Sequence, residues 1–499
     1  MSEAGPRVVV VGGGNAGLCA AIAARENGAE VTVLECAPRE LAGGNSSFTA
    51  GLMRTVFKGL DDIRVLAPEL TQEQIVTTDF GSYPREQFLG DLARMTEYRC
   101  DPDLAVTLVD KSHETLTWMR GHGVRFAPAY GRQAFRIEGK FVFWGGVVVE
   151  VVGGGPGLVS SLTTEAERLG VKILYEATAR DLIPSDDGAV QGVRARVKDE
   201  TTEFGADAVV LATGGFQANR EWRTRYLGPG WDLAKVRGSR FNTGDGIRMA
   251  LELGASSAGN WSGCHAVAWD LNAPEFGDLS VGDGYQKHSY PFGIMVNSEG
   301  QRFVDEGADF RNFTYAKYGR AVLDQPHQVA WQIFDAQVTH LLRDEYRIRQ
   351  VTKVSANTLE DLTHNLDGVD SAGAMSTILA YNDAVRRDIP FNPNVLDGRR
   401  TKGLDVPKSN WANAIEVPPF EAYAVTCGIT FTFGGLRIDT AARVINVAGK
   451  PIKGLFCCGE MAAGIFYFNY PGGSGLTAGS VFGQLAGHGA SAQLSSQNH

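Results

Sequence analysis

Residues 8–35 read VVVVGGGNAGLCAAIAARENGAEVTVLE, and this stretch decides the fold. The unbroken β-branched run at residues 8–11 predicts a strand buried on both faces of a parallel sheet. A glycine-rich turn follows, then a helix from about residue 18 to residue 27, which Gly28 ends. Residues 30–34 predict a second strand. The stretch is therefore typical of a βαβ unit in an α/β protein.

The turn carries a dinucleotide-binding pattern, because Gly12, Gly14 and Gly17 stand in GxGxxG spacing between strand and helix. The first glycine permits the tight turn, the second lets the backbone approach a pyrophosphate, and the third allows close helix–strand packing. Glu35 closes the second strand 21 residues after Gly14. A carboxylate there accepts hydrogen bonds from a ribose diol and disfavours a 2′-phosphate. The pattern predicts FAD or NAD, and disfavours NADP.

Further glycine-rich segments separate FAD from NAD. An NAD domain usually continues into an ordinary helix after the second strand, whereas this chain continues with a glycine pair. Each segment alone predicts only a turn, but five of them spread over the chain favour a large cofactor. The segments are GGNSS at 43–47, ATGG at 212–215, TGDG at 243–246, GLFCCGE at 454–460 and YPGGSGLT at 470–477.

Composition limits the function classes. The 499 residues are 43% hydrophobic and 21% charged, as in an ordinary enzyme, and this length predicts two domains. The net charge of −10 argues against a nucleic-acid partner. Seven scattered cysteines lack CxxC and CxxCH spacings, which favours structural thiols in a reducing cytoplasm. We expect no metal site, nucleophile motif, signal peptide or transmembrane helix.

Together these segments resemble the fumarate reductase/succinate dehydrogenase flavoproteins, which bind FAD and open or close carbon–carbon double bonds. QRFVDE at 301–306 and NYPGGSGLT at 469–477 are most similar to the subgroup of FAD-dependent tricarballylate dehydrogenases. The resemblance implies a Rossmann-like FAD-binding domain assembled from both chain ends, residues 1–260 and 423–499. It also implies an inserted α+β capping domain over residues 261–422.

The resemblance implies that FAD binds non-covalently, because SSFT at 46–49 lacks the histidine to which some family members attach it. No haem-attachment motif is present, so electrons would come from or go to an external partner. The expected cofactor-binding residues are Gly12, Gly14, Asn15, Ala16, Gly17, Glu35, Cys36, Gly43, Gly44, Asn45, Ser46, Ala212, Thr213, Gly214, Asp245, Gly459, Glu460, Ser474, Gly475 and Leu476.

The resemblance also implies a catalytic set between the two domains, of which this chain keeps half. His265 stands at the cap start, and Arg311 follows the QRFVDE stretch where the family places a proton-carrying arginine. Phe433 replaces the family's second histidine, and Tyr470 replaces its second carboxylate-binding arginine. These departures argue against fumarate as the substrate.

Residues 470–472, YPG, are locally similar to the 3-ketosteroid dehydrogenases, whose tyrosine hydrogen-bonds a substrate ketone. Tyr470 therefore either polarises a carbonyl or takes the α-proton, and Arg311 either takes the proton or holds a carboxylate. His265 lies in an apolar stretch, so core packing is about as good an explanation as substrate contact. Arg132, Arg136 and Lys140 flank an aromatic run that ends at Trp144, which predicts a solvated β-hairpin, with substrate contact as the alternative. His288 and Tyr290 receive the same interpretation.

The leading hypothesis is an FAD-dependent dehydrogenase that desaturates a small carboxylate or ketone, tricarballylate-like in type, by α-proton removal and hydride transfer to flavin N5. The alternatives are a ketone desaturase of a cyclic oxo compound, an ene reductase that runs the reverse reaction, and a flavin-binding module without catalysis.

Overall fold

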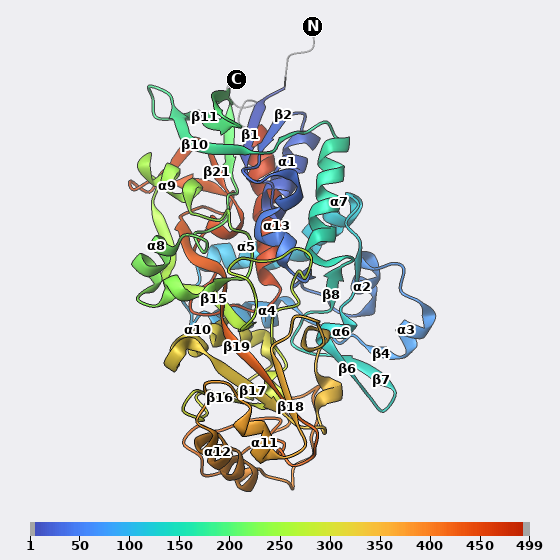
Figure 1. The fold of residues 1–499 in the computed structure, drawn as a ribbon. Helices are drawn as coiled ribbons and strands as arrows, with labels where there is room; N and C mark the ends of the chain where they lie inside the picture. Colours follow the sequence, from blue (N-terminus) through green and yellow to red (C-terminus); the bar gives the residue numbers. More distant parts are fainter. Residues whose placement is uncertain (1–4, 493–499) are drawn as a thin grey trace.

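The computed structural model describes residues 5–492, and a six-stranded sheet in the order β20-β21-β13-β1-β2-β9 organises its upper part (Figure 1). β1 pairs in parallel with β2 and β13, and β21 pairs in parallel with β13. The start and the end of the chain therefore share one sheet. This confirms the predicted fold class, a Rossmann-like domain built from both chain ends.

The elements have the following bounds. The strands are β1 (Arg7–Val11), β2 (Glu30–Leu34), β3 (Leu52–Met53), β4 (Thr78–Asp79), β5 (Phe126–Pro128), β6 (Ala134–Ile137), β7 (Lys140–Phe143), β8 (Val149–Val151), β9 (Lys172–Leu174), β10 (Ala177–Pro184), β11 (Val190–Val197), β12 (Glu200–Gly205), β13 (Ala208–Leu211), β14 (Lys235–Val236), β15 (Ser257–Asp270), β16 (Ile294–Asn297), β17 (Ala330–Phe334), β18 (Lys353–Ala356), β19 (Phe420–Leu436), β20 (Arg443–Ile445) and β21 (Pro451–Cys457). The α-helices are α1 (Asn15–Glu26), α2 (Leu60–Leu66), α3 (Gln72–Val76), α4 (Arg85–Met95), α5 (Pro102–Gly121), α6 (Tyr130–Gln133), α7 (Gly154–Arg168), α8 (Arg220–Trp222), α9 (Asp245–Glu252), α10 (Tyr315–Leu323), α11 (Leu359–His364), α12 (Ser371–Ala384) and α13 (Ser474–Ala492).

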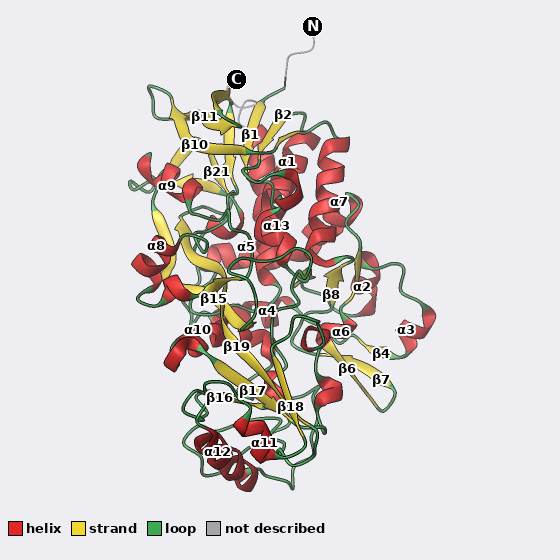
Figure 2. Ribbon diagram, viewed as in Figure 1, coloured by secondary structure: helices red, strands yellow, loops and turns green. Residues whose placement is uncertain are grey.

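Helices α1 and α13 pack against each other beside this sheet, with α7 next to α1 (Figure 2). Three glycines on one face of α13 make the close approach possible. A Cβ at Gly483 would lie 2.4 Å from the carbonyl oxygen of Ala16, and one at Gly487 would lie 2.2 Å from that of Ala20. Gly479 faces the same helix near Asn15. Side chains here would force the two helices apart.

Two long antiparallel strands, β15 and β19, run from the Rossmann-like half into the cap. β17 and β18 pair with β19 in the cap, and a separate hydrophobic cluster that includes Ile294, Trp331 and Ile378 fills the space between this sheet and α12. The predicted domain boundaries, 260/261 and 422/423, fall inside β15 and β19. The two halves are thus joined by one antiparallel strand pair, whose ladder is irregular between Asn260 and Cys264 and between His265 and Ala266.

Element predictions from sequence agree best where a local signal marks both ends of the element. The predicted helix over residues 102–121 is confirmed with the same bounds, because the Asp101 side chain caps its first turn and Pro102 occupies the first position. The helix predicted from Gly157 begins three residues earlier, at Gly154. No helix within residues 5–492 is long and apolar enough to cross a membrane.

We expect Gly483→Ala to destabilise the protein by about 1–3 kcal/mol, because the new methyl group meets a backbone carbonyl that cannot move without shifting α1. The matched control is Gly90→Ala in α4, where a Cβ meets nothing within 4 Å. Gly90→Ala should be neutral or stabilise by up to about 1 kcal/mol through helix propensity. Urea unfolding of both holoenzymes, followed by circular dichroism, makes the comparison. Equal free energies of unfolding would contradict the packing argument.

Candidate active site

A large cavity lies at the carboxyl ends of the parallel strands β1, β2, β13 and β21 and extends to the cap strands. Ligands of open α/β sheets bind at this edge. Eighteen of the predicted cofactor residues line the cavity: Gly12, Gly14, Asn15, Ala16, Glu35, Cys36, Gly43, Gly44, Asn45, Ser46, Ala212, Thr213, Gly214, Asp245, Gly459, Glu460, Gly475 and Leu476.

The glycine turn between β1 and α1 needs its glycines for separate reasons. Gly12 has a φ of +109°, and a Cβ there would lie 2.3 Å from the Ala212 carbonyl oxygen. Gly17 does not line the cavity; a Cβ on it would lie 2.0 Å from the Gly12 carbonyl oxygen. Gly14 faces the cavity and is the N-cap of α1, without a side-chain cap. The first turn of α1 therefore presents backbone N–H groups to the cavity, a favourable place for a phosphate.

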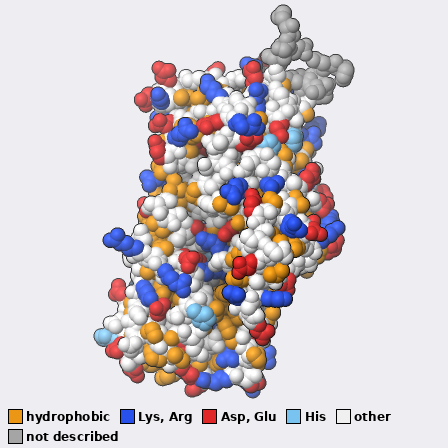
Figure 3. Space-filling model, turned by 90° about the vertical axis from the view of Figure 1, so that its right-hand side faces the viewer, with side chains coloured by type: hydrophobic (Ala, Val, Ile, Leu, Met, Phe, Trp, Pro, Cys, Tyr) orange, Lys and Arg blue, Asp and Glu red, His pale blue; other side chains and the backbone are white. Residues whose placement is uncertain are grey.

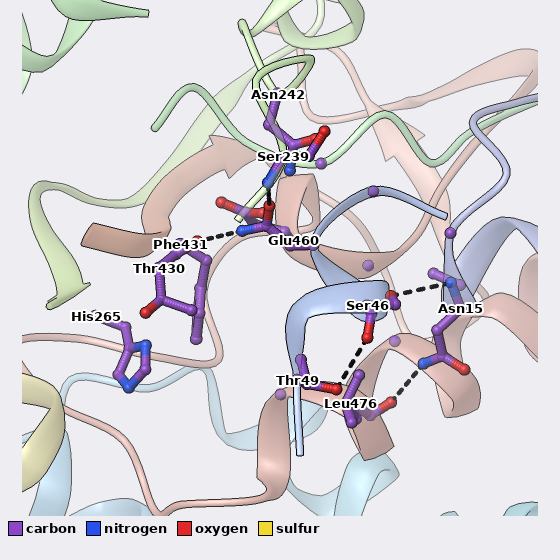
Figure 4. Close-up of a pocket in the computed structure, with 18 of the residues that line it drawn as sticks. Asn15, Ser46, Thr49, Ser239, Asn242, His265, Thr430, Phe431, Glu460 and Leu476 are labelled. Atoms are coloured by element: carbon purple, nitrogen blue, oxygen red, sulfur yellow. Dashed lines mark hydrogen bonds between the residues drawn. The ribbon is translucent and has the colours of Figure 1, made fainter. Parts of the chain in front are cut away.

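Asn15 ties three segments together at this helix end (Figure 4). Its backbone N–H donates to Ser46 Oγ at 3.1 Å, and its Nδ2 donates to the Leu476 carbonyl oxygen at 2.9 Å. Ser480 donates to Asn15 Oδ1 at 3.1 Å. The start of α1 is thus held against the start of α13. Ser474 does not line the cavity, because its fully buried hydroxyl donates to the Pro471 carbonyl oxygen at 2.5 Å.

Two carboxylates stand in the cavity wall, Glu35 buried and Glu460 partly exposed. Glu35 Oε2 accepts from the Gly13 N–H and Oε1 from the Ala37 N–H, both at 2.8 Å. Burial raises the pKa of Glu35, and these hydrogen bonds oppose the rise. Burial also raises the pKa of Glu460 to about 7, against opposing hydrogen bonds from Thr432 and Gln217 among others. Both side chains hold backbone segments that form the wall.

At the cap side of the cavity, His265 and Tyr470, two of the three predicted catalytic residues, meet Tyr315. The ring of His265 on β15 lies 4.9 Å from the ring of Tyr315 and 4.9 Å from the ring of Tyr470, centroid to centroid. The two tyrosine hydroxyls hydrogen-bond to each other. Neither ring nitrogen of His265 has a hydrogen-bond partner among residues 5–492. Figure 4 shows His265 across the pocket from Asn15 and Leu476.

The environment moves the pKa values of these groups in opposite directions. Burial, and secondarily the charge of Arg237, lowers the pKa of His265 well below its ordinary value, so the imidazole is neutral. Burial, with the neighbouring Tyr315, raises the pKa of Tyr470 well above its ordinary value, although Arg237 opposes the rise. Burial likewise raises the pKa of Tyr315. Such divergence between neighbouring groups is typical of acid–base sites.

Two buried arginines bring positive charge to the same end. Arg237 donates through Nε and Nη2 to Asp283 Oδ1, at 2.8 and 2.6 Å, and through Nη1 to Thr430 at 3.1 Å. Arg311, the third predicted catalytic residue, donates through Nη2 to the Arg132 carbonyl oxygen at 2.7 Å. Its buried Nε has no partner in the described part of the chain. Arg311 thus has unused donors.

Several lining residues were missed from sequence. Arg237 and Asp283 stand in no recognisable motif, and a solvent-exposed hairpin was the interpretation for Arg132, which lines the cavity. His288 is buried in the cavity wall with both ring nitrogens unpartnered among the residues described. Tyr315 offered a usable signal, since it follows Arg311 by four residues. No group of three or more His, Cys, Asp or Glu in residues 5–492 is arranged to hold a metal ion.

The residues present fit a dinucleotide flavin. The wall has glycine turns where side chains would intrude, an uncapped helix N-terminus, and polar groups from both chain ends. The fold and this cavity define the class of FAD-dependent oxidoreductases.

Comparison with known proteins supports the assignment to FAD-dependent oxidoreductases. A family model described as FAD binding domain matches residues 7–476. A probable fumarate reductase Ifc3 of Shewanella frigidimarina (strain NCIMB 400) is 30% identical over 96% of this chain and 74% of its own. The chain belongs to the fumarate reductase/succinate dehydrogenase family of FAD-binding flavoproteins, whose members reduce or form carbon–carbon double bonds.

One further relative and one solved structure are similar over nearly the whole chain. The 4-oxocyclohexanecarboxylate 2-dehydrogenase of Sinomonas cyclohexanicum is 27% identical, over 96% of this chain and 92% of its own. The structure of a 3-ketosteroid Δ1-dehydrogenase from Sterolibacterium denitrificans superposes with a TM-score of 0.73, covering 97% of this chain and 99% of its own, at 21% identity. The second similarity concerns the fold alone.

We expect Glu35→Ala to weaken FAD binding about tenfold or more, because it removes the acceptor of two backbone hydrogen bonds that shape the turn. Glu40→Ala, an exposed neighbour, is the control. Titration of the FAD-free proteins, with quenching of flavin fluorescence as the signal, measures the dissociation constants. Unchanged affinity in Glu35→Ala would contradict this role.

Proposed function

We propose that this enzyme desaturates a small ketone that also carries a carboxylate, by removing a proton from the α-carbon and a hydride from the β-carbon. The observation that carries the proposal is the packing of the Tyr315 and Tyr470 rings, whose hydroxyls hydrogen-bond to each other, against a neutral His265. The His265 ring nitrogens have no partner among residues 5–492, and Arg311 lines the same cavity. When bound, FAD supplies the hydride acceptor. An external electron acceptor completes the cycle.

FAD would be held by the glycine turn of residues 12–17, by the segment of residues 43–46, and by the start of α13. These lie around one cavity and are tied together through Asn15. The non-covalent attachment predicted from SSFT at residues 46–49 is part of the proposal, because this segment offers no histidine.

In this proposal His265 donates a hydrogen bond to the substrate carbonyl. Its lowered pKa keeps it neutral, and a neutral imidazole still has one N–H to donate. A donor aimed at the carbonyl oxygen stabilises the negative charge that develops there when the α-proton leaves. The site excludes water around this donor because His265, Tyr315 and Tyr470 are all buried.

The Tyr315–Tyr470 pair takes the α-proton. Burial makes each phenolate a strong base that is rarely populated at neutral pH. The charge of Arg237 favours both phenolates and partly offsets burial. The hydrogen bond between the two hydroxyls lowers the pKa of Tyr315 and raises that of Tyr470. The pair can hold the proton on either oxygen.

Arg311 binds the carboxylate of the substrate. It is buried, lines the cavity and has an Nε without a partner among residues 5–492, and a guanidinium pairs well with a planar carboxylate. A ketone as the reactive group is supported by Phe433 and Tyr470, which replace two charge partners expected for a four-carbon dicarboxylate. A relative named for 4-oxocyclohexanecarboxylate is consistent with such a substrate.

A second candidate is a tricarballylate-like polycarboxylate. The presence of three arginines, Arg132, Arg237 and Arg311, around the cap end of the cavity favours it. Asp283 neutralises much of the charge of Arg237, which weakens this case.

Anaerobic mixing of the oxidised holoenzyme with a substrate panel tests the function. The panel contains a cyclohexanone carboxylate, succinate, tricarballylate and a 3-ketosteroid. The cyclohexanone carboxylate should bleach the flavin band at about 450 nm, while succinate should not. Bleaching by tricarballylate alone would select the second candidate. Failure of all four compounds, with reoxidation of the reduced enzyme by their unsaturated partners, would select the reductase direction.

We expect Tyr470→Phe to lower kcat by about 10²–10⁴-fold with FAD still bound, because the proton acceptor is lost. Because the pKa of Tyr470 is raised, the phenolate fraction and the wild-type kcat/KM should rise about tenfold per pH unit from neutral into alkaline solution. Tyr470→Phe should flatten this dependence. Tyr467→Phe, outside the cavity, is the control. A steep alkaline rise that survives in Tyr470→Phe would remove Tyr470 from proton transfer.

A further inference from the structure

One segment from the N-terminal part of the chain crosses to the cap: residues 129–146, here called the strap, which comprise α6, β6 and β7. β6 and β7 form the predicted hairpin. The residues before the hairpin do not extend into solvent; Arg132 and Gln133 line the same cavity as the catalytic residues.

The strap is fastened to the cap by backbone carbonyls and aromatic rings. Arg343 Nη1 donates to the Gly131 carbonyl oxygen at 2.9 Å, and Arg311 Nη2 donates to that of Arg132 at 2.7 Å. Trp144 stacks on Phe310 with the ring centroids 5.3 Å apart. These contacts fix the backbone from which the Arg132 side chain enters the cavity.

The Arg132 guanidinium has no hydrogen-bond acceptor within residues 5–492, although its side chain is only 27% exposed. Its nearest acidic groups are loosely placed, with Nη1 3.7 Å from Asp283 Oδ2 and Nε 4.0 Å from Glu150 Oε2. Asp283 already accepts two hydrogen bonds from Arg237. The donors of Arg132 are therefore available to a ligand.

Other polar atoms around this end of the cavity also lack partners in the described chain. They are Oε1 of Gln133, Nε of Arg311 and both ring nitrogens of His288, all in buried side chains that line the cavity. Leaving a buried polar group unsatisfied costs about 1–3 kcal/mol. Several such atoms around one space indicate that a polar ligand group belongs there.

We propose that Arg132 and Arg311 form an oxyanion subsite that holds a substrate carboxylate remote from the reacting carbon, with the strap as a specificity-determining element. The carboxylate would lie between a guanidinium from the N-terminal half and one from the cap. This inference rests on the proposed function only for the identity of the reacting group, since the subsite itself concerns binding.

The local charge suits a single carboxylate. Arg132, Arg237 and Arg311 face Asp283 and Glu150, which leaves one guanidinium in excess, while Arg343 and Glu345 near this end offset each other. A phosphate dianion carries two negative charges, more than this one excess positive charge. Figure 3 shows Lys and Arg side chains gathered in a recess near mid-height of the molecule, consistent with an attraction for anions.

The test measures binding without turnover. Holoenzyme whose flavin has been chemically reduced cannot accept a hydride, so a ketone can be titrated calorimetrically under anaerobic conditions. The probes are 4-oxocyclohexanecarboxylate and the uncharged 4-methylcyclohexanone, in chloride buffer without phosphate. The proteins are the wild type, Arg132→Gln, and the control Arg136→Gln, an exposed arginine of the same hairpin whose Nε donates to Gly139 within the hairpin turn.

Arg132→Gln should raise the dissociation constant of 4-oxocyclohexanecarboxylate at least tenfold and leave that of 4-methylcyclohexanone within about twofold, a selective loss typical of a charge-assisted pair. Arg136→Gln should change neither constant. Arg132→Lys should restore part of the affinity, because it returns the charge without the fork geometry.

Equal affinity of Arg132→Gln and wild type for the carboxylate would overturn the subsite, as would equal losses for both probes. Flavin bleaching of the oxidised enzyme separates this result from the proposed function. Arg132-dependent carboxylate binding without bleaching by any ketone would leave the subsite standing and remove the ketone assignment. Bleaching of the wild type by both ketones with equal kcat/KM would support ketone desaturation and contradict the carboxylate subsite.

Discussion

The close packing of α13 against α1 is the constraint on which the rest of the structure depends. Gly483 and Gly487 of α13 lie against backbone carbonyls of α1, and Gly479 lies against the side chains of Asn15 and Ala16. This contact brings two helix N-termini, at Gly14 and Ser474, to one edge of the sheet. A pyrophosphate is bound well where backbone N–H groups converge. Here the two helix N-termini converge because the glycines of α13, farther along the helix, allow it to pack closely on α1. The cofactor site thus begins with helix packing.

Burial at the cap end of the cavity shifts the pKa values of the candidate catalytic groups. His265, Tyr315 and Tyr470 are ordinary side chains, and each would have an unremarkable pKa in water. Enclosing them together destabilises every charged form, so the imidazole loses its proton more readily and the phenols keep theirs. The same buried environment therefore keeps His265 neutral, as a hydrogen-bond donor, and keeps the two tyrosines protonated until they lose a proton and act as a base. Arg237 belongs to the same arrangement, because its charge acts on both groups in the same direction, toward the deprotonated form.

Sequence predicted those features of the fold and site that depend on neighbouring residues. The roles of Gly12 and Glu35 follow from a turn and a strand end, and both lie where the pattern indicates. Arg237, Asp283 and His288 could not be found this way, because the cap packs segments far apart in sequence against each other. Arg132, Arg136 and Lys140 have the polar spacing of an exposed hairpin, which favours solvent over substrate contact for Arg132. The hairpin exists, but hydrogen bonds from Arg311 and Arg343 draw the residues before it into the cavity.

The shared sheet also has a consequence for how the protein is made. β1 emerges first during synthesis, yet one of the strands that complete its sheet, β21, and the helix that packs on α1 are among the last segments to emerge. Domains fold as units during translation, and this one cannot close before α13 has left the ribosome. Until then the Asn15 side chain lacks Leu476 and Ser480, its hydrogen-bond partners in α13, although Ser46 is already present. The wall of the cofactor cavity is therefore completed only when α13 packs on α1.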